Sequence, residues 1–131
     1  MSGSIFDKYY SIPFQKRGCS FDGCNCYGFI RLWYKEELGI DLPIYNLCPS
    51  EIPDDYIKSE ATNNFFPVTD YVDHDAVIIL DNDGKPKHTG IFYQNYILHM
   101  SRAKGFLIEN FRRIKPRIVS VYRYKHETDL G

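Results

Sequence analysis

The chain has 131 residues, which suits one domain, and we expect residues 1–131 to fold as a single unit. Apolar residues make up 44% of the chain and charged residues 25%, an ordinary globular composition that excludes a disordered or a fibrous protein. No apolar run approaches the roughly 18 residues that a membrane helix needs, so we expect no membrane span.

The N-terminal segment MSGSIFDKYYSIPF has no basic region followed by an apolar stretch, so it does not resemble a secretory signal peptide. Either the protein stays in the cytosol or it leaves by a route that needs no signal. Four cysteines in such a chain are better interpreted as thiols than as two disulfide bridges.

The formal net charge of −1 hides an uneven distribution along the chain. Residues 36–83 carry twelve acids and one base, whereas residues 101–125 carry eight bases and one acid. Two complementary faces of one globule would explain this pattern. The alternative is a basic rim that attracts an anionic partner. Nucleic acid is not expected as that partner, because the domain as a whole is not basic.

The first expected element is a helix over residues 26–38. Asn25 is a good N-cap for it, because the side-chain oxygen of Asn can accept a hydrogen bond from an unpaired N–H of the first turn. Apolar residues at helical spacing form one stripe, made of Cys26, Phe29, Ile30 and Trp33. Gly39 suits the left-handed conformation that ends a helix, and Pro43 prevents continuation.

Prolines interrupt residues 41–72, where we expect only a short helix over about 53–62. Five short strands follow, at residues 76–80, 89–93, 96–100, 106–108 and 118–124. Gln94 and Asn95 form the turn of a hairpin between the second and the third of them. Helices first and antiparallel strands afterwards predict an α+β fold rather than a parallel, doubly wound sheet.

Cys26 is the most suggestive residue for chemistry. If Asn25 caps the helix, Cys26 lies in the first turn, where unpaired N–H groups and the helix dipole favour a negative charge. A thiol in that position loses its proton more easily, and the thiolate is the nucleophile. Gly28, two residues later, would leave space for a substrate. The alternative is a buried structural cysteine, since Cys is among the most buried residue types.

A nucleophile needs a base, and His88 and His99 lie on the two arms of the expected hairpin. With a two-residue loop, His88 pairs with Ser101, and His99 becomes the diagonal neighbour of His88 on the same face. One imidazole could then hold the other in a fixed tautomer. Taken singly, each histidine would be an ordinary strand residue.

A zinc site is the weaker alternative for the cysteines. Cys24-x-Cys26 with Cys19 and Cys48 lacks the paired C-x₂-C spacing of structural zinc sites, so we expect neither a metal nor another cofactor. His74, between two aspartates just before a strand, is interpreted as a loop residue.

The run NCYGFIRLWYKEELGIDLP, residues 25–43, resembles the nucleophile helix of the NlpC family of papain-like cysteine peptidases. Its continuation Leu-Pro-Ile-Tyr, residues 42–45, is most similar to the members found in tailed bacteriophages and related tail-like particles. Downstream, HTGIFYQNYILH, residues 88–99, resembles the histidine hairpin of the family. The similarity extends from about residue 13 to residue 124.

The resemblance implies a papain-like core, with the nucleophile helix packed on an antiparallel sheet of about five strands. It implies that Cys26 is the nucleophile, His88 the general base and His99 the orienting third residue. The implied reaction is hydrolysis of an amide in the stem peptides of bacterial peptidoglycan, typically after D-glutamate. The backbone N–H of Cys26 is the expected oxyanion donor at the helix N-terminus.

Some positions differ from the usual pattern of the family. Asn25 stands where the family usually has Asp; it can still cap a helix but carries no charge. Phe14 stands where many cell-wall members have a tyrosine that helps to bind substrate, and it matches the tail-type pattern. Phe14, Tyr27 and Gly28 are the candidates for lining the substrate cleft. The Gly-Asp pair that commonly opens the next strand is His74-Asp75 here.

Two functions are compatible with this resemblance. The first is a cysteine peptidase of a phage or prophage tail, which would open the cell wall locally during DNA entry. It would be made in the bacterial cytoplasm and assembled into the virion with other tail proteins as partners. The alternative is a structural or assembly part of a tail tip with little turnover, which Asn25 in place of Asp favours. The same fold could instead carry an amidase or an acyl transferase.

Overall fold

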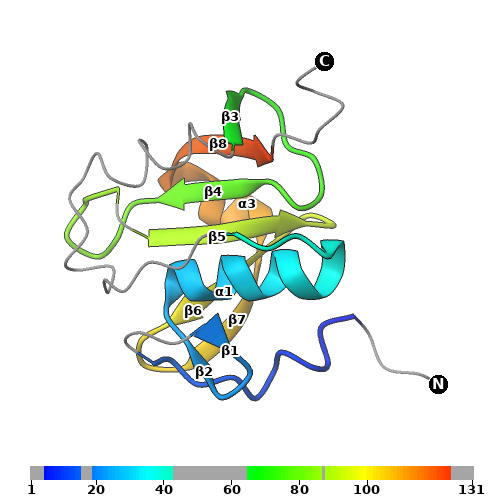
Figure 1. Ribbon diagram of the computed structural model, residues 1–131. Helices are drawn as coiled ribbons and strands as arrows, with labels where there is room; N and C mark the ends of the chain where they lie inside the picture. Colours follow the sequence, from blue (N-terminus) through cyan, green and yellow to red (C-terminus); the bar gives the residue numbers. More distant parts are fainter. Residues whose placement is uncertain (1–4, 16–18, 43–64, 87, 125–131) are drawn as a thin grey trace.

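The computed structural model describes residues 5–15, 19–42, 65–86 and 88–124 (Figure 1). Its centre is a sheet of six strands: β3 (Phe65–Val68), β4 (Ala76–Ile79), β5 (His88–Tyr93), β6 (Tyr96–Ser101), β7 (Gly105–Asn110) and β8 (Ile118–Tyr124). The order across the sheet is β3-β8-β4-β5-β6-β7, and every neighbouring pair is antiparallel. The helix expected over residues 53–62 lies outside the described residues.

All five strands expected from the sequence are present, and β3 is the sixth. β4 to β7 form a continuous meander, after which β8 returns and inserts between β3 and β4. β3 was missed because it contains Pro67, which the sequence analysis took as a breaker. Proline is tolerated here because β3 lies at the edge of the sheet, where the strand has a neighbour on one side only.

The helix expected over residues 26–38 begins and ends where it was expected. It is α1 (Cys26–Trp33), continued by the π-helical turn η1 (Tyr34–Leu38). The side-chain oxygen of Asn25 accepts a hydrogen bond from the backbone N–H of Gly28 at 2.6 Å. Gly39 ends the helix with a φ of 67°, the left-handed conformation that glycine adopts readily. The apolar spacing did not reveal that the last turn is π-helical.

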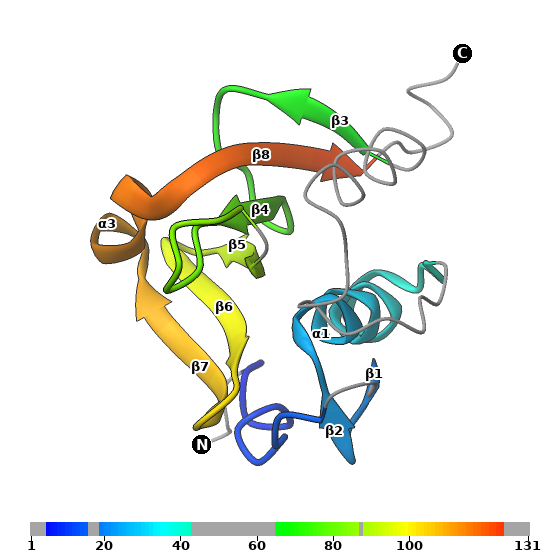
Figure 2. The same cartoon turned by 90° about the vertical axis from the view of Figure 1, so that its left-hand side faces the viewer.

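The main core lies between α1 and the sheet. Phe29 and Trp33 of α1 are fully buried and belong to the same apolar cluster as Ile91 of β5 and Leu98 of β6. Tyr9, from the N-terminal segment, packs against the rings of Phe29 and Trp33. Figure 2 shows α1 on one side of the curved sheet and α3 on the other.

The opposite face of the sheet has its own smaller core. α3 (Phe111–Ile114) and the 3₁₀ turn η3 (Lys115–Arg117) connect β7 to β8 and cover this face. The buried residues of this cluster are Val77, Ile79, Phe92, Ile97, Ile114 and Val121. The two faces therefore alternate along β5, with Ile91 toward α1 and Phe92 toward α3.

Two short strands lead into α1. β1 (Cys19–Ser20) and β2 (Gly23–Cys24) form a small antiparallel hairpin that ends two residues before Cys26. Phe14 joins β2 through a parallel bridge to Cys24. Phe14 is thereby held close in space to the start of α1, although it lies twelve residues before Cys26 in the sequence.

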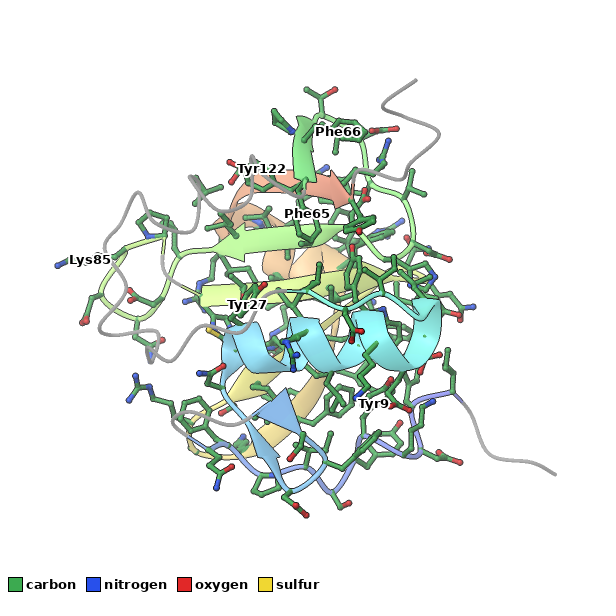
Figure 3. All side chains as sticks on the ribbon, viewed as in Figure 1. Tyr9, Tyr27, Phe65, Phe66, Lys85 and Tyr122 are labelled. Atoms are coloured by element: carbon green, nitrogen blue, oxygen red, sulfur yellow. The ribbon has the colours of Figure 1, made fainter. Side chains whose placement is uncertain are left out.

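The N-terminal segment is fastened to the sheet and to the helix. The backbone N–H of Phe106 donates to the carbonyl of Ile12 at 3.1 Å. Gly105 permits this approach, because a Cβ at that position would lie 2.4 Å from the same carbonyl oxygen. The hydroxyl of Tyr9 donates to the carboxylate of Glu37 at 2.5 Å. In Figure 3, Tyr9 lies beneath the helix and Tyr27 at its start. Within the described ranges, no helix has the length and apolar character to cross a membrane.

Candidate active site

α1 and β5 begin at the same end of the molecule (Figure 1). Cys26 is the first residue of α1, and only 2% of its surface is exposed. The hydroxyl and the backbone N–H of Thr89 lie against its thiol. His88, the first residue of β5, immediately precedes Thr89. The fold thus brings the expected nucleophile to the residue next to the expected base.

The hairpin of β5 and β6 has the expected register next to its turn, but the expected pair of His88 with Ser101 is not part of the ladder. Tyr93 pairs with Tyr96 across a turn in which Gln94 and Asn95 both have positive φ, 50° and 66°. The ladder between the two strands covers three pairs and ends at Ile91. The first residues of β5 extend beyond that ladder, and this is where the thiol of α1 reaches the strand.

His88 and His99 are hydrogen bonded to each other. Nε2 of His88 lies 2.8 Å from Nδ1 of His99, and the two rings are close to perpendicular, at 82°. Gly90, two residues after His88, lies close against β6: a Cβ there would come within 3.0 Å of the Leu98 carbonyl oxygen and 3.2 Å of Cγ2 of Ile97. The diagonal arrangement inferred from the hairpin is therefore present, and one imidazole holds the other.

Glu109 extends the pair to a chain of three side chains. Its Oε2 lies 2.8 Å from Nε2 of His99. Glu109 was not predicted as a site residue, because the sequence predicts a strand that ends at residue 108, whereas β7 continues to Asn110. Strand periodicity could have identified Glu109. If the strand continues past residue 108, Glu109 lies on the same face as Leu107, which pairs with His99.

Burial raises the pKa of the Cys26 thiol. The backbone N–H groups of Cys26 and Tyr27 oppose this shift, and so do the hydroxyl and the backbone N–H of Thr89. The sequence analysis expected a thiol that ionises easily at the helix N-terminus. That expectation is wrong for this site, because the loss of hydration outweighs the helix N–H groups, and the neutral thiol is favoured.

Burial also lowers the pKa values of both histidines. The pKa of His88 falls to about 3, since burial is the main cause, repulsion from the Arg117 guanidinium and from protonated His99 adds to it, and Asp81 opposes it only in part. For His99, Glu109 acts against the shift. At neutral pH the site therefore holds a neutral thiol and neutral imidazoles rather than a thiolate–imidazolium pair.

The Thr89 hydroxyl is buried, and in the part of the chain that the structure describes it has no hydrogen-bond partner. It lies against Cys26, where a hydrogen bond from it would favour the thiolate over the thiol. A buried hydroxyl without a partner is unfavourable by roughly 1–3 kcal/mol, so such groups call for an explanation. Thr89 was not singled out by the sequence analysis, in which a strand threonine carries no special signal.

Of the other expected site residues, Asn25 serves as the predicted cap. It is buried, and its side-chain oxygen is engaged by Gly28 at 2.6 Å. Phe14 is half-buried beneath the guanidinium of Arg102, which lies 5.4 Å from the ring centroid. Tyr27 is half-buried at the start of α1. That Phe14, Tyr27 and Gly28 line a substrate cleft stays a prediction.

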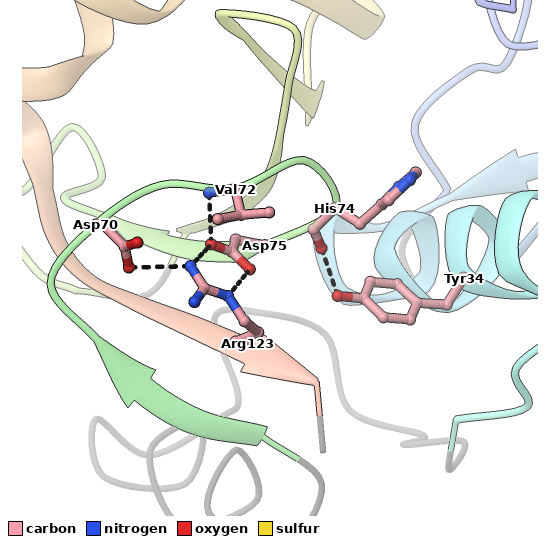
Figure 4. Close-up of polar contacts among 6 residues, drawn as sticks. All are labelled: Tyr34, Asp70, Val72, His74, Asp75 and Arg123. Carbon is pink, nitrogen blue, oxygen red and sulfur yellow. Dashed lines mark hydrogen bonds and ion pairs between the residues drawn. The ribbon is translucent and has the colours of Figure 1, made fainter. Parts of the chain in front are cut away.

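His74 belongs to the turn before β4, as the sequence analysis expected of a loop residue, and it adopts a φ of 80°. This left-handed backbone is the conformation that glycine adopts most readily, and here a histidine adopts it. Two contacts to α1 and η1 hold the histidine there. Trp33 donates its indole N–H to Nδ1 of His74 at 3.0 Å, and the Tyr34 hydroxyl donates to the carbonyl of His74 (Figure 4).

Asp75 is a structural residue. Its buried carboxylate accepts two hydrogen bonds from Arg123 of β8, at 3.0 and 2.8 Å, and one from the backbone N–H of Val72 at 2.8 Å (Figure 4). The same guanidinium reaches Asp70 at 3.0 Å. These contacts connect the turn before β4 to β8, at a distance in sequence from the histidine pair.

Two solved structures with a similar fold are described as NlpC/p60 or NLP/P60 proteins. The NlpC/p60 domain of the peptidoglycan hydrolase SagA matches with a TM-score of 0.62 and 14% identity, over 90% of this chain and 91% of that chain. A Staphylococcus aureus protein described as similar to a lipoprotein of the NLP/P60 family matches with a TM-score of 0.61 and 19% identity. That match covers 92% of this chain and 39% of the other. No family model and no curated protein matches the sequence.

The chain therefore has the NlpC/p60 fold, and the expected α+β class with a helix packed on an antiparallel sheet is confirmed.

Proposed function

We propose that this protein is a cysteine peptidase that hydrolyses an amide bond in the stem peptides of bacterial peptidoglycan. The observation that carries the proposal is the hydrogen-bonded pair of His88 and His99, which begins beside the residue that contacts the Cys26 thiol. The resemblance of both segments to the NlpC family supports it. So does the fold, because one similar domain belongs to a protein described as a peptidoglycan hydrolase.

In the proposed reaction the sulfur of Cys26 attacks the carbonyl carbon of the amide, and Nδ1 of His88 accepts the thiol proton. Nδ1 is the available ring nitrogen, because Nε2 is engaged by His99. The imidazolium then protonates the leaving amine, and water hydrolyses the thioester to release the acid. Since burial favours the neutral thiol and the neutral imidazole, proton transfer accompanies the attack instead of preceding it.

The oxyanion of the tetrahedral intermediate would be stabilised at the start of α1. The backbone N–H of Cys26 belongs to the first turn, where N–H groups have no partner within the helix. The side chain of Asn25 caps the N–H of Gly28 in the same turn and so helps to hold the start of the helix in place.

The test compares wild type with Cys26→Ala and His88→Ala on purified peptidoglycan, with released fragments identified by mass spectrometry. We expect wild type to release peptides with new amino termini and both variants to release none. Cys24→Ser is the matched control: Cys24 is also buried, and its thiol donates to the carbonyl of Ser20 at 3.1 Å, away from the histidines. Equal release by wild type and Cys26→Ala would overturn the proposal.

The proposed setting is a phage or prophage tail, with the enzyme carried in the particle and other tail proteins as its partners. Its support is the likeness of residues 42–45 and of Phe14 to the tail-type pattern. Mass spectrometry of purified particles from an induced lysate tests this setting. The presence of the chain in the particle at a fixed ratio to tail proteins is expected, and its absence would remove the tail from the proposal.

A structural role in a tail tip is the second candidate, and the burial of Cys26 favours it, because only 2% of the residue is exposed. A thiol-reactive probe applied across a range of pH separates the two functions. Alkylation of Cys26 that depends on His88 supports the peptidase. Alkylation with the pH profile of an ordinary thiol, unchanged in His88→Ala, supports the structural role. The masses of the products then distinguish a peptidase from an amidase or an acyl transferase.

A further inference from the structure

Three polar side chains form a continuous hydrogen-bonded row across β5, β6 and β7. His88 contacts His99 at 2.8 Å, and His99 contacts Glu109 at 2.8 Å. The ladder places them on one face: His99 pairs with Leu107, so Glu109, two residues along β7, lies diagonally across from His99. The side chains of His99 and Glu109 are 12% and 25% exposed, so both groups are largely shielded from water.

The atoms in this row determine where the protons are. An ionised carboxylate can only accept hydrogen bonds, so Nε2 of His99 carries a proton and donates it to Glu109. His99 is neutral, because burial lowers its pKa, and its Nδ1 is therefore unprotonated and acts as an acceptor. Nε2 of His88 must then be the donor in the contact between the two rings.

These proton positions determine the state of Nδ1, the other ring nitrogen of His88. A neutral imidazole with its proton on Nε2 has a lone pair on Nδ1, which is the form that can accept a proton from a thiol. When His88 becomes protonated, its Nε2–H still donates to His99, and the carboxylate at the end of the row favours the new positive charge. The carboxylate of Glu109 thus determines which atom donates and which accepts in each hydrogen bond of the row.

We propose that Glu109 is a positioning residue that fixes the tautomers of both histidines and so makes Nδ1 of His88 the proton acceptor. Its effect on turnover rests on the proposed peptidase function. Its effect on the tautomers does not, because the hydrogen bonds exist without substrate.

The test replaces Glu109 by Gln, which keeps the shape of the side chain but can also donate a hydrogen bond. Donation to Nε2 of His99 allows the reversed row, in which Nδ1 of His88 carries the proton. Imidazole nitrogen spectra, recorded as ¹H–¹⁵N correlations at neutral pH, report the tautomer of each ring. We expect Nε2–H on both histidines in wild type and a substantial population of Nδ1–H on His88 in Glu109→Gln. Identical tautomers in the two proteins would overturn the proposal.

Two further measurements separate this inference from the proposed function. Alkylation of Cys26 by iodoacetamide needs no peptidoglycan, and its rate should fall about ten- to a hundredfold in Glu109→Gln, the range seen when a supporting hydrogen bond is removed. If the protein cleaves peptidoglycan, kcat should fall by a similar factor with KM little changed. Altered tautomers in a protein without peptidase activity would leave the role of Glu109 intact and overturn the function.

Glu36→Gln is the charge-matched control. Glu36 lies in η1, at the end of the helix remote from Cys26, and its carboxylate is 3.9 Å from Lys8. We expect wild-type spectra and wild-type alkylation in this variant. Glu109→Asp, which keeps the carboxylate, should restore part of the rate. If Glu36→Gln slowed alkylation as much as Glu109→Gln, a general charge effect would replace the positioning role. Far-UV circular dichroism of each variant verifies that it is folded.

Discussion

The Thr89 hydroxyl has no hydrogen-bond partner among the described residues, which lowers the free energy of unfolding, and it lies directly beside the thiol that the proposed chemistry uses. Buried polar groups without partners are unusual, and they are explained most simply by a partner that exists in another state of the site. Here that partner is the thiolate of Cys26, which accepts hydrogen bonds more strongly than the thiol. Under the proposed function, the Thr89 hydroxyl would stabilise the thiolate of the reacting state rather than the resting thiol.

Thr89→Val tests this interpretation, because valine has the same shape and no hydroxyl. The free energy of unfolding should increase by about 1 kcal/mol, since an unsatisfied group is removed from the interior. The pKa of Cys26 should rise further, and its alkylation at pH 8 should slow. Ser120→Ala is the control, because the Ser120 hydroxyl is the other buried one without a partner among the described residues. The same gain in stability with unchanged alkylation is expected there.

If Thr89→Val alkylated as fast as wild type, the hydroxyl would have no part in stabilising the thiolate. Urea titration and a pH series of alkylation rates provide the two measurements.

At the scale of elements, the start of α1 depends on a single cap. Asn25→Ala removes the acceptor of the Gly28 N–H and should lower the free energy of unfolding by about 1 kcal/mol. Asn25→Asp keeps an acceptor at the same position and should retain that stability, while its negative charge near Cys26 raises the pKa of the thiol further. Urea unfolding together with alkylation rates distinguishes the two effects. Equal stability of wild type and Asn25→Ala would contradict the capping role.

The elements that could be predicted from the sequence are those defined by local signals. The helix follows from its cap, its apolar stripe and Gly39; the hairpin follows from Gln94-Asn95, which both adopt positive φ. The register of that hairpin was enough to place His88 beside His99.

The elements that could not be predicted are held by tertiary contacts. α3 is four residues long and is stabilised by the packing of Phe111 on Tyr71, with ring centroids 4.6 Å apart, which no local pattern indicates. Glu109 was missed because the end of a strand is poorly defined by sequence. The raised pKa of Cys26 was missed because burial is a property of the folded molecule.

At the scale of the whole molecule, burial has the same effect on three histidines. His74, His88 and His99 all have pKa values below the ordinary value of 6.5. In the unfolded chain each would bind a proton near pH 6.5, whereas the folded sites resist protonation. Stability is therefore at its full value above about pH 6.5 and falls as the pH decreases from there toward the folded pKa values.

The predicted loss is steep. His88 alone, with a folded pKa of about 3, contributes about 1.4 kcal/mol for each pH unit within that window. Urea unfolding at pH 7.5 and pH 5 measures it, with a smaller free energy of unfolding expected at pH 5. Asn tolerates the left-handed backbone at this position, so His74→Asn should remove only the part of this pH-dependent loss of stability that His74 contributes. Equal stability at the two pH values would show that the folded histidines titrate normally.

The position of β8 has a consequence for synthesis. Because this strand, Ile118–Tyr124, inserts between β3 and β4, it is the strand that pairs β3 with the meander of β4 to β7 in the described sheet. A nascent polypeptide emerging from the ribosome can form the meander of β4 to β7, but it cannot complete the sheet until β8 has also been made. Long-range strand pairing of this kind closes large loops and is slow. A ribosome-bound chain stopped before β8 would therefore remain incompletely folded.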